Sequence, residues 1–318
     1  MKELVTGSSG YLGSIAVSHL VAKGCEVIGL DMKKPDGKVD GDGFRFYECN
    51  STDGSCVRDI FSRELPDAVL HFACSMNRLR NRKEEFGMDV GGSFNVIEAA
   101  RRTPSVRKFV FSSSAAIYGP AARSELWLDE AEPLNPGHYT YGLNKRLIEQ
   151  MLFRVNGDHP MRTVSLRICT VVGPRYSRPK SVVSILLRLP FLPESFSRTS
   201  VQFLHEDDFN ELLNLVLHDS EIEGVFNLAP DSCSVVGEIV PPARFHRFPC
   251  SAIKPVMWAL WNLRMVNLQP AGLGFCLYPV VLDSKRLARR YDYRFRHSST
   301  ESFLLTKERN SLPPVARF

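Results

Sequence analysis

The stretch VTGSSGYLG (residues 5–13) carries a glycine at every third position, from Gly7 through Gly10 to Gly13. The apolar run ELVT (3–6) overlaps its start and predicts a short buried strand. Mainly apolar residues then recur at the spacing of one helix face up to Gly24, which predicts an amphipathic helix. The stretch is therefore the turn between a first strand and a first helix.

This turn has the properties of a loop that binds phosphate groups. Gly7 permits a tight turn, Gly10 lets the backbone approach a pyrophosphate, and Gly13 permits close packing of helix against strand. Asp31 ends the next predicted strand, where its carboxylate can accept both hydroxyls of a ribose. Because Asp31 would repel a 2′-phosphate, we expect NAD and consider NADP less favoured. The nearby Lys33–Lys34 pair weakens that preference.

Short apolar runs alternate with helical patterns through the first half of the chain. Near-continuous apolar runs are typical of buried parallel strands. The predicted strands are 3–6, 26–31, 44–48, 67–73, 107–113 and 162–168, and further helices are predicted at 91–102, 141–155 and 180–189. This alternation predicts right-handed βαβ units in an α/β fold with a Rossmann-like, doubly wound parallel sheet.

The regular alternation of predicted strands and helices ends after residue 174. We expect residues 1–174 to form an NAD-binding Rossmann domain, to which the chain returns at about 201–229. Residues 175–200 and 230–318 are expected to form a smaller, irregular substrate-binding lobe over the carboxyl edge of the sheet, where ligands bind in such folds.

The composition favours a soluble globular protein: 318 residues, 44% of them hydrophobic and 24% charged. The net charge of +5 is mild and basic residues are scattered, so no nucleic-acid partner is expected. The basic stretch RLRNRK (78–83) is the exception; it is either a solvated loop or a ligand contact. The longest apolar stretches, 182–193 and 253–263, are too short to cross a bilayer, so no membrane partner is expected.

The eight cysteines include no CxxC pair and no Cys/His cluster with zinc spacing. We therefore expect unbridged thiols, a reducing compartment and no metal site. The N-terminal MKELVTGSSG enters structured sequence at once, which leaves no room for a signal peptide. A cytoplasmic location is the expectation.

Three polar residues form a candidate catalytic group. Ser114 stands at the end of the strand in FVFSSSAAIYG (109–119). Tyr141 and Lys145 share a helix face, whereas Tyr139 does not. A tyrosine with a pKa of about 10 can act as a base at neutral pH only if a cation lowers that value. The group predicts proton transfer coupled to hydride transfer at an alcohol carbon, with the serine orienting the substrate oxygen. An ordinary amphipathic helix is the alternative.

Taken together, these motifs resemble an extended short-chain dehydrogenase/reductase of the NAD-dependent epimerase/dehydratase group. TGSSGYLG is similar to its TGxxGxxG, SSSAAIYG to its serine-strand motif and YGLNK to its YxxxK. LHFAC (70–74), DVGGSFNVIEAA (89–100) and LRICTVVGPR (166–175) resemble later landmarks, so the likeness covers roughly residues 1–230. The resemblance implies Tyr141 as acid/base, Lys145 as its partner and ribose ligand, and Ser114 as donor to the substrate oxygen.

The resemblance also implies a set of cofactor contacts. These are Gly7, Gly10, Tyr11, Leu12, Gly13, Asp31, Asn50, Ser51, Phe72, Ala73, Cys74, Asp89 and Cys169. It further implies a small-molecule substrate and a homodimer formed through the helices near 90–103 and 141–155.

The chain departs from the family at several positions. Asp89 replaces an asparagine, Asn50 replaces an aspartate at the adenine, and Thr170 replaces a substrate-site asparagine. Val201 stands where sugar-nucleotide epimerases carry a diphosphate-binding arginine, with Arg198 three residues upstream.

Two further departures concern the substrate. The segment LQPAGLG (268–274) lacks the second diphosphate arginine, so a diphosphate would lose charge-assisted bonds. Ala115 and Ala116 replace the acid pair that sugar dehydratases use for elimination.

Three functions follow in order of preference. The first is an NAD-dependent oxidoreductase acting at a secondary alcohol or ketone, on a substrate less polar than a nucleotide sugar. Its apolar pocket would use Met257, Trp258, Trp261, Phe275 and Tyr278, for which core packing is an equal alternative. The second is a nucleotide-sugar 4-epimerase similar to UDP-glucose 4-epimerase. The third is a non-catalytic dinucleotide-binding sensor, which the intact Ser, Tyr and Lys group opposes.

Overall fold

A computed structural model of the chain describes residues 1–37, 41–75, 81–121, 127–156, 159–176, 182–188, 192–247, 250–263, 265 and 270–311. In this part of the chain the centre is a seven-stranded, all-parallel sheet in the order β12-β7-β5-β4-β1-β2-β3. The strands are β1 (Lys2–Thr6), β2 (Glu26–Asp31), β3 (Phe44–Glu48), β4 (Ala68–His71), β5 (Lys108–Ser114), β7 (Arg162–Ile168) and β12 (Gly224–Leu228). The predicted Rossmann-like, doubly wound α/β fold is confirmed.

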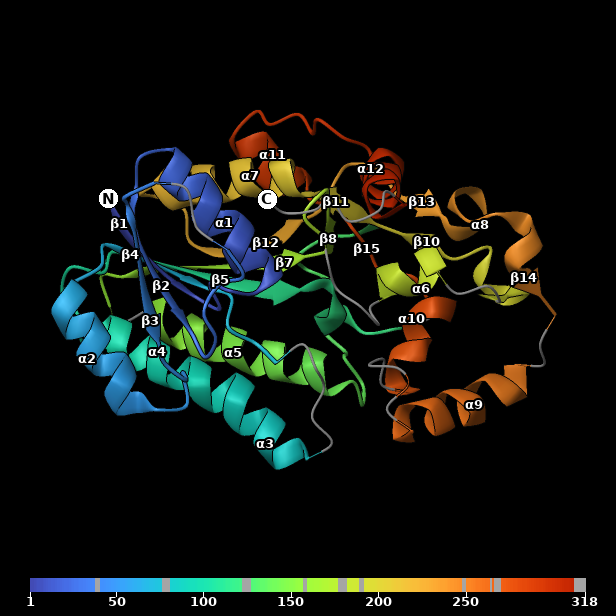
Figure 1. Cartoon of the computed structure of the whole chain (residues 1–318), viewed down its shortest axis with the longest axis horizontal. Helices are drawn as coiled ribbons and strands as arrows, with labels where there is room; N and C mark the ends of the chain where they lie inside the picture. The colour runs from blue at the N-terminus through green and yellow to red at the C-terminus, as the bar shows by residue number, and fades with distance from the viewer. Residues whose placement is uncertain are drawn as a thin grey trace.

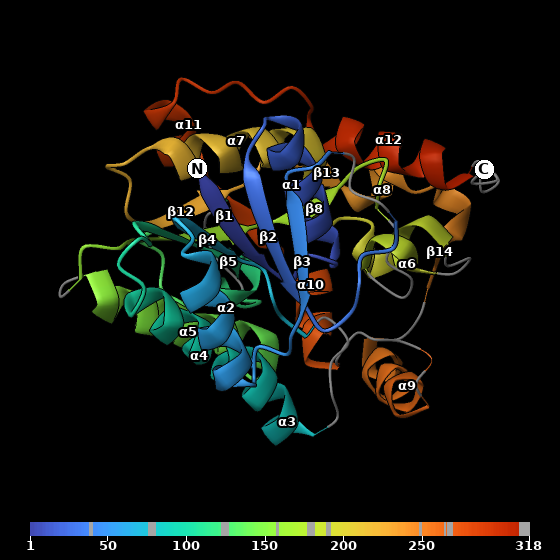
Figure 2. The ribbon, with the colours of Figure 1, turned by 60° about the vertical axis from the view of Figure 1, so that its left-hand side comes forward.

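Helices cover both faces of the sheet (Figures 1 and 2). One layer holds α1 (Tyr11–Ala22), α7 (Glu206–His218) and α11 (Lys285–Arg290), and the other holds α2 (Gly54–Glu64), α4 (Gly92–Arg101) and α5 (Thr140–Asn156). Successive residues of β1 point to opposite faces, so Val5 belongs to the core under α1 and α7 while Leu4 belongs to the core under α2, α4 and α5. Both side chains are fully buried.

The strand order reverses between β1 and β4. In open α/β sheets, the carboxyl ends of the strands at such a reversal form the crevice in which ligands bind. The loops that follow β1, β4 and β5 therefore meet at the edge of the sheet where the sequence places the phosphate loop and Ser114.

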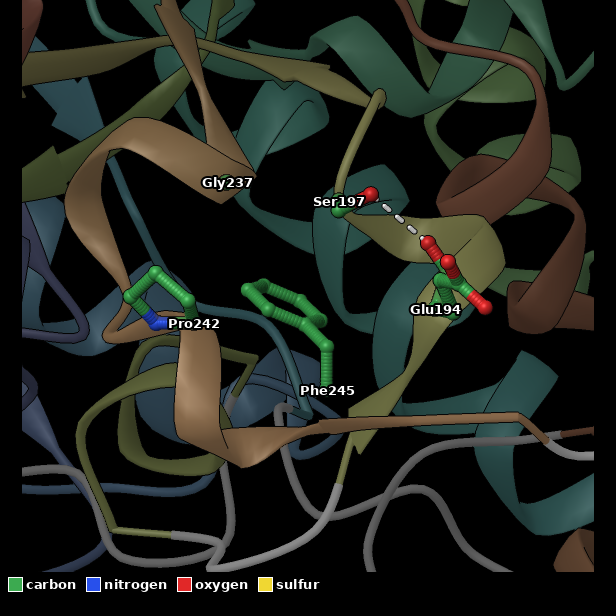
Figure 3. Close-up of a pocket in the computed structure, with 5 residues that line it drawn as sticks. All are labelled: Glu194, Ser197, Gly237, Pro242 and Phe245. Atoms are coloured by element: carbon green, nitrogen blue, oxygen red, sulfur yellow. Dashed lines mark hydrogen bonds between the residues drawn. The ribbon is translucent and has the colours of Figure 1, made fainter.

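Most elements of the second half that lie outside the main sheet are found to one side of it, at the right of Figure 1. They are α6 (Val182–Arg188), β9 (Leu192–Pro193), η3 (Glu194–Phe196), β10 (Ser200–Val201), β13 (Ser234–Val235), α8 (Val236–Ile239), η4 (Pro242–Arg244), β14 (Phe245–His246), α9 (Cys250–Asn262), η5 (Pro270–Leu273) and α10 (Gly274–Leu277). A cavity of about 320 Å³ among them is lined by Glu194, Ser197, Gly237, Pro242 and Phe245 (Figure 3). None of these five is a predicted site residue.

The other described elements are short segments between or beside these helices and strands, together with the C-terminal helix. They are α3 (Arg82–Phe86), η1 (Gly87–Gly91), η2 (Ala115–Tyr118), β6 (Trp127–Leu128), β8 (Thr170–Val172), β11 (Phe203–His205), β15 (Val281–Leu282) and α12 (Ser299–Ser311). Strand β8 pairs with β11, and β6 pairs with β15. After α11 the chain stays close to α7, where Tyr293 donates a hydrogen bond to Asp208 at 2.7 Å.

The predicted strands match the structure closely, and 26–31, 44–48 and 162–168 have the predicted bounds. The run 67–73 is longer than β4, which ends at His71. The helix predicted at 180–189 is found at 182–188, and its remaining positions lie outside the described residues. Among the described helices, none has the length and hydropathy needed to cross a membrane.

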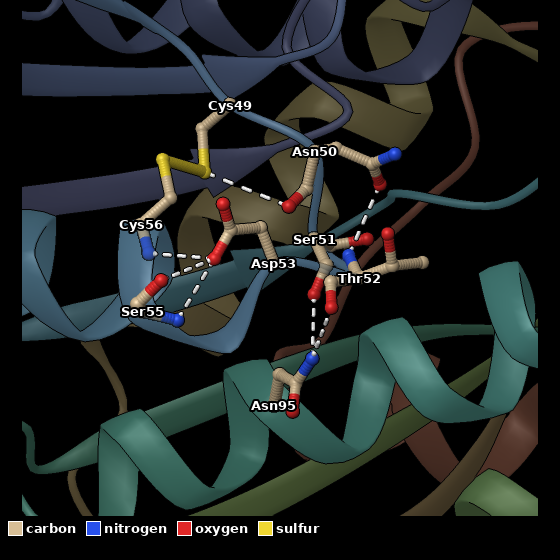
Figure 4. Close-up of a disulfide and its surroundings, with 8 residues drawn as sticks. All are labelled: Cys49, Asn50, Ser51, Thr52, Asp53, Ser55, Cys56 and Asn95. Atoms are coloured by element: carbon tan, nitrogen blue, oxygen red, sulfur yellow. Dashed lines mark hydrogen bonds between the residues drawn. A yellow bond between two sulfur atoms is a disulfide. The ribbon is translucent and has the colours of Figure 1, made fainter.

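The expectation of unbridged thiols is wrong for one pair of cysteines. Cys49 follows β3 and Cys56 lies in the first turns of α2, and the structure joins them in a disulfide (Figure 4). Their Cα atoms are 6.3 Å apart at a sequence separation of seven, because the chain between them turns back on itself to start the helix. Cys25, Cys74, Cys169 and Cys233 are free thiols.

Candidate active site

Two glycines of the phosphate loop are required by its geometry. Gly7 has φ +69°, and a Cβ there would lie 2.7 Å from the backbone nitrogen of Ala73. A Cβ on Gly13 would lie 2.0 Å from the carbonyl oxygen of Gly7. Gly10 caps α1 with an ordinary φ of −73°. The tight turn and the close helix contact are as predicted, and the role of Gly10 toward a pyrophosphate stays a prediction.

Asp31 holds the phosphate loop from the end of β2. Its carboxylate accepts hydrogen bonds from the backbone nitrogen of Ser9 at 3.0 Å and of Lys33 at 3.2 Å. Carboxylate oxygens have further acceptor capacity, so these bonds leave room for ribose hydroxyls. The side chain is only half-buried.

The side chains that open α1 anchor the helix. The hydroxyl of Tyr11 donates to Glu206 at 2.9 Å, and its ring meets that of Tyr176 edge-on with centroids 5.1 Å apart. Leu12 packs against the core under α1 and α7. Their predicted contacts with a cofactor would thus come from the backbone of the first helical turn, whose N–H groups have no partner inside the helix.

The loop after β3 is held by α4. Asn50 is exposed, and its side-chain oxygen accepts from the backbone nitrogen of Thr52 at 3.0 Å. The carbonyl of Ser51 accepts from the side chain of Asn95 at 2.9 Å (Figure 4). The predicted adenine loop is therefore fixed from beneath while Asn50 faces outward.

The end of β4 lies against the phosphate loop. Ala73 donates its backbone N–H to the hydroxyl of Thr6 at 3.3 Å. Phe72 is buried, with its ring 6.1 Å from that of Phe209, and Cys74 is half-buried. Across the sheet, burial raises the pKa of the Cys169 thiol, so this cysteine remains protonated at neutral pH.

The three predicted catalytic residues meet at the carboxyl end of β5. Ser114 ends the strand, and its hydroxyl accepts from the backbone nitrogen of Ala116 at 3.2 Å. Lys145 is only 2% exposed, and its Nζ donates to the carbonyl of Ser112 at 2.5 Å. The same nitrogen lies 5.6 Å from the centroid of the Tyr141 ring.

Close packing fixes this arrangement. A Cβ on Gly142 would lie 2.6 Å from the carbonyl oxygen of Ala116, so the first turn of α5 rests on the residues that follow Ser114. Tyr139 sits beside Tyr141, with ring centroids 6.0 Å apart, and its ring centroid lies 5.3 Å from that of Phe275 in α10. The ring of Tyr139 thus bridges the Tyr–Lys helix and the C-terminal elements.

A buried chain of hydrogen bonds, which the sequence did not reveal, joins the phosphate loop to α5. Ser93 Oγ lies 2.5 Å from the carbonyl oxygen of Asp89, so the serine donates there and accepts from Nε2 of His71 at 2.8 Å. Nδ1 of His71 then accepts from Thr6 at 2.6 Å. Burial, and secondarily the charge of Lys145, lower the pKa of His71 to about 3, so the ring is neutral.

Asp89 completes this connection with its side chain. One oxygen accepts from the backbone of Ser75 at 2.8 Å and the other from Asn144 at 3.0 Å. Asn144 immediately precedes Lys145. The residue predicted as a cofactor contact is thus 2% exposed and braces the loop after β4 against α5.

A second buried network of hydrogen bonds, which the sequence also did not reveal, is centred on Arg167. Arg167 of β7 is 5% exposed and forms two bonds to Glu149, at 2.9 and 3.2 Å. It also donates to the hydroxyl of Tyr118 at 2.9 Å, which itself donates to Asn227 at 2.8 Å. A buried guanidinium with a bidentate carboxylate partner fixes β7, α5 and β12 relative to one another.

The residues predicted to line an apolar pocket differ in their exposure and contacts. Phe275 reaches Tyr139, but Trp258 is 63% and Tyr278 43% exposed, so the latter two are not core residues. Met257 and Trp261 are half-buried on α9.

The structure places both positions that concern binding of a diphosphate on or beside β10. Arg198 is exposed next to β10, and Val201 lies in that strand. Of the basic stretch, residues 78–80 lie outside the described residues, and Arg82 and Lys83 are exposed at the start of α3.

Curated relatives share sequence with part of this chain. UDP-glucose 4-epimerase from Erwinia amylovora is 32% identical over 189 residues, which cover 56% of this chain and 55% of that protein. UDP-glucose 4-epimerase from Streptomyces lividans is 32% identical over 177 residues, covering 54% and 53%. The chain spans about half the length of the curated relatives that it matches.

Solved structures share the fold over almost the whole chain. The UDP-glucose 4-epimerase of Thermus thermophilus in complex with NAD has a TM-score of 0.76 at 23% identity, covering 97% of this chain and 98% of that one. The Bordetella bronchiseptica enzyme WbmG in complex with NAD has a TM-score of 0.75 at 23% identity, covering 98% and 94%. Likeness at this identity shows the fold alone.

The family is shown by the sequence. The model of the NAD dependent epimerase/dehydratase family matches residues 3–229, more than two thirds of the chain. This range holds the glycine loop, Ser114, Tyr141 and Lys145. The chain belongs to the NAD-dependent epimerase/dehydratase family.

Proposed function

We propose that this protein catalyses NAD-dependent hydride transfer at a secondary alcohol or ketone carbon, with Tyr141, Lys145 and Ser114 as the reacting group. One observation carries the proposal: the ammonium of Lys145 is buried one helical turn from Tyr141, at the strand end that bears Ser114. A buried cation beside a phenol favours its ionised form, which a neutral-pH base needs.

The division of work among the three residues follows from their positions. NAD, when bound, supplies a hydride acceptor or donor. Tyr141 takes the proton of the substrate hydroxyl during oxidation and returns it during reduction. Ser114 donates a hydrogen bond to the substrate oxygen, and Lys145 stabilises the tyrosine anion through its charge.

The cofactor site is proposed on the opposite side of the same crevice. The first turn of α1 would take the pyrophosphate, Asp31 the ribose hydroxyls, and the loop at Asn50 and Ser51 the adenine. Solved neighbours in complex with NAD support this placement. Asp31 favours NAD over NADP by its charge.

The substrate is proposed to lie toward the C-terminal elements, residues 175–200 and 230–318. The contact of Tyr139 with Phe275 supports this, because it brings α10 to the start of the Tyr–Lys helix. A substrate less polar than a nucleotide sugar fits the aromatic residues of α9 and α10 and the replacement of the epimerase arginine by Val201.

Nucleotide-sugar 4-epimerisation is the second candidate. It uses the same residues but returns the hydride to the opposite face of a rotated 4-keto sugar, without net change of the cofactor. The names of the curated relatives favour it, whereas the substitution at Val201 opposes it.

A single screen separates the candidates. The protein is incubated with alcohols, ketones and nucleotide sugars while NADH absorbance and sugar products are followed. Net NADH change supports the first candidate, and epimerised sugar without net change supports the second. Tight NAD binding without turnover of any compound would contradict both and favour the dinucleotide sensor.

We also infer a homodimer formed through α4 and α5, together with α3. Large apolar side chains are exposed on these neighbouring helices, namely Phe86, Phe94, Leu143, Leu147 and Phe153. Burying such a surface against a second copy is the simplest way to remove it from water. The cytoplasmic location stays a prediction, and the disulfide weakens its cysteine argument.

A further inference from the structure

Glu3 is a carboxylate in the hydrophobic core. It lies in the middle of the sheet, between Val27 of β2 and Ala68 of β4, and is 0% exposed. Because β1 alternates, Glu3 points to the same face as Val5, under α1 and α7. Among the described residues, its oxygens interact only weakly with the thiol of Cys25 and have no strong hydrogen-bond partner.

A buried carboxylate in this state is costly. Removing a carboxylate from water without strong hydrogen bonds disfavours its charged form. An isolated buried charge is normally retained only with a cation or a paired base. Glu3 is therefore either a neutral acid or one ligand of a positive ion.

Two other metal-ligating side chains converge on it. Cys25 immediately precedes β2 and is half-buried, and His218 is the exposed last residue of α7. One ligand atom from each of Glu3, Cys25 and His218 lies within 4.8 Å of the others.

The orientation of His218 suits a ligand. Its Nδ1 lies 2.8 Å from the carbonyl oxygen of Asn214, which can only accept. Nδ1 therefore carries the proton and Nε2 keeps its lone pair. A backbone carbonyl on the second ring nitrogen is the usual support of a metal-binding histidine.

We propose that Glu3, Cys25 and His218 form a binding site for a divalent transition-metal ion of the zinc type. A thiolate, an imidazole and a carboxylate form a donor set typical of Zn²⁺, and two anionic ligands balance its charge in a buried place. Ligand atoms around such an ion lie about 3.5 Å apart, so three atoms that already lie within 4.8 Å of one another need to approach only slightly. Water can occupy the fourth position from the His218 side.

The site lies at the amino ends of β1 and β2, at the opposite edge of the sheet from Tyr141. The ion would tie the last turn of α7 to two central strands and take no part in the proposed hydride transfer. Sequence spacing could not suggest it, because the three ligands lie on three separate elements.

Cobalt titration of the full chain tests the proposal. The protein is stripped with a chelator under reducing conditions, titrated with Co²⁺, and followed by its thiolate-to-cobalt charge-transfer and d–d absorption. The variants are Cys25→Ser and the surface change His218→Gln, and the matched control is Cys233→Ser, which removes another half-buried free thiol.

We expect one tetrahedral Co²⁺ per chain in the wild type and in Cys233→Ser, displaced by Zn²⁺. Affinity should fall by about 100-fold or more in Cys25→Ser and by about 10- to 100-fold in His218→Gln. Zn²⁺ should raise the melting temperature of the wild type more than that of either variant. Absence of the charge-transfer band, or a band that survives in Cys25→Ser, would overturn the proposal and leave Glu3 as a neutral buried acid.

Discussion

His71 shows how a single buried side chain supports the site. It has a hydrogen-bond partner on each ring nitrogen and a pKa lowered to about 3 by burial. In the unfolded chain its pKa is about 6.5. Between about pH 3 and pH 6.5 the imidazole is protonated in the unfolded chain but neutral in the folded protein. The contribution of His71 to the free energy of unfolding therefore decreases as the pH falls below about 6.5.

A His71→Gln variant isolates this effect. Acidification from pH 7 to pH 5 should reduce the free energy of unfolding of the wild type more than that of the variant, by up to about 2 kcal/mol. Urea unfolding at several pH values measures both. All other titrating groups are common to the two proteins, so their contributions cancel in the comparison. Equal slopes would mean that His71 is not held neutral.

Asp31 is the residue that should decide between the two nicotinamide cofactors. Asp31→Asn keeps an oxygen for the backbone of Ser9 but removes the charge. We expect NAD to bind about tenfold more weakly and the preference for NAD over NADP to shrink. Isothermal titration measures both affinities. The control is Glu48→Gln, which removes the charge of the residue in β3 that pairs with Asp31. An unchanged NAD/NADP ratio would contradict the assignment.

Among single residues, the sequence predicted those that interact with a partner nearby in the chain. Tyr141 and Lys145 are one helical turn apart, so their pairing needs no knowledge of the fold. His71, Ser93 and Asn144 could not be found in this way, because their partners come from four different elements. Arg167 was quoted within a motif, but its bidentate bond to Glu149 depends on packing of β7 against α5.

At the scale of elements, the phosphate loop depends on contact between the start of α1 and the end of β1. Gly13→Ala would place a Cβ 2.0 Å from the Gly7 carbonyl, and backbone on both sides cannot yield cheaply. We expect a loss of about 2–3 kcal/mol in unfolding free energy, together with weaker NAD binding. Denaturant unfolding measures the loss.

Gly91→Ala is the matched control. Gly91 has a helical φ of −64°, and a Cβ there would meet nothing within 4 Å. This variant should be as stable as the wild type or gain up to about 1 kcal/mol. Similar losses in both variants would show that the close approach at Gly13 is not what the loop requires.

The central strands were predictable because parallel strands buried on both faces read as apolar runs. Helix α12 was not predicted; its buried face includes Phe303, which packs against Phe203 in a contact about a hundred residues apart in sequence. The Cys49–Cys56 bridge was missed because it depends on how the chain turns from β3 into α2.

At the scale of the whole molecule, the exposed apolar surface of α4 and α5 predicts a dimer. Phe153 is 79% exposed, so Phe153→Asp should fold normally but place a charge in the interface. Sedimentation analysis should show a dimer for the wild type and a shift toward monomer for the variant. Leu304→Asp, on the exposed side of α12, is the control and should leave the dimer intact. A monomeric wild type would contradict the proposed interface.

The parallel, doubly wound character of the sheet was implied by the alternation of strands and helices, whereas the arrangement of residues 175–200 and 230–318 was not. Short strands such as β9 and β14 are only two residues long and carry no periodic signal. Substrate identity depends on this region, which is why the sequence specifies the reaction step more sharply than the compound.

The comparison of Tyr141→Phe with Tyr139→Phe tests the central claim most directly. Both changes keep the aromatic ring and its contacts and remove one hydroxyl, at positions two residues apart. With the substrate found by the screen, we predict that turnover of Tyr141→Phe falls by about 10²- to 10⁴-fold while NAD affinity is retained, and that Tyr139→Phe stays close to the wild type. Full activity in Tyr141→Phe, or an equal loss in both variants, would contradict the account.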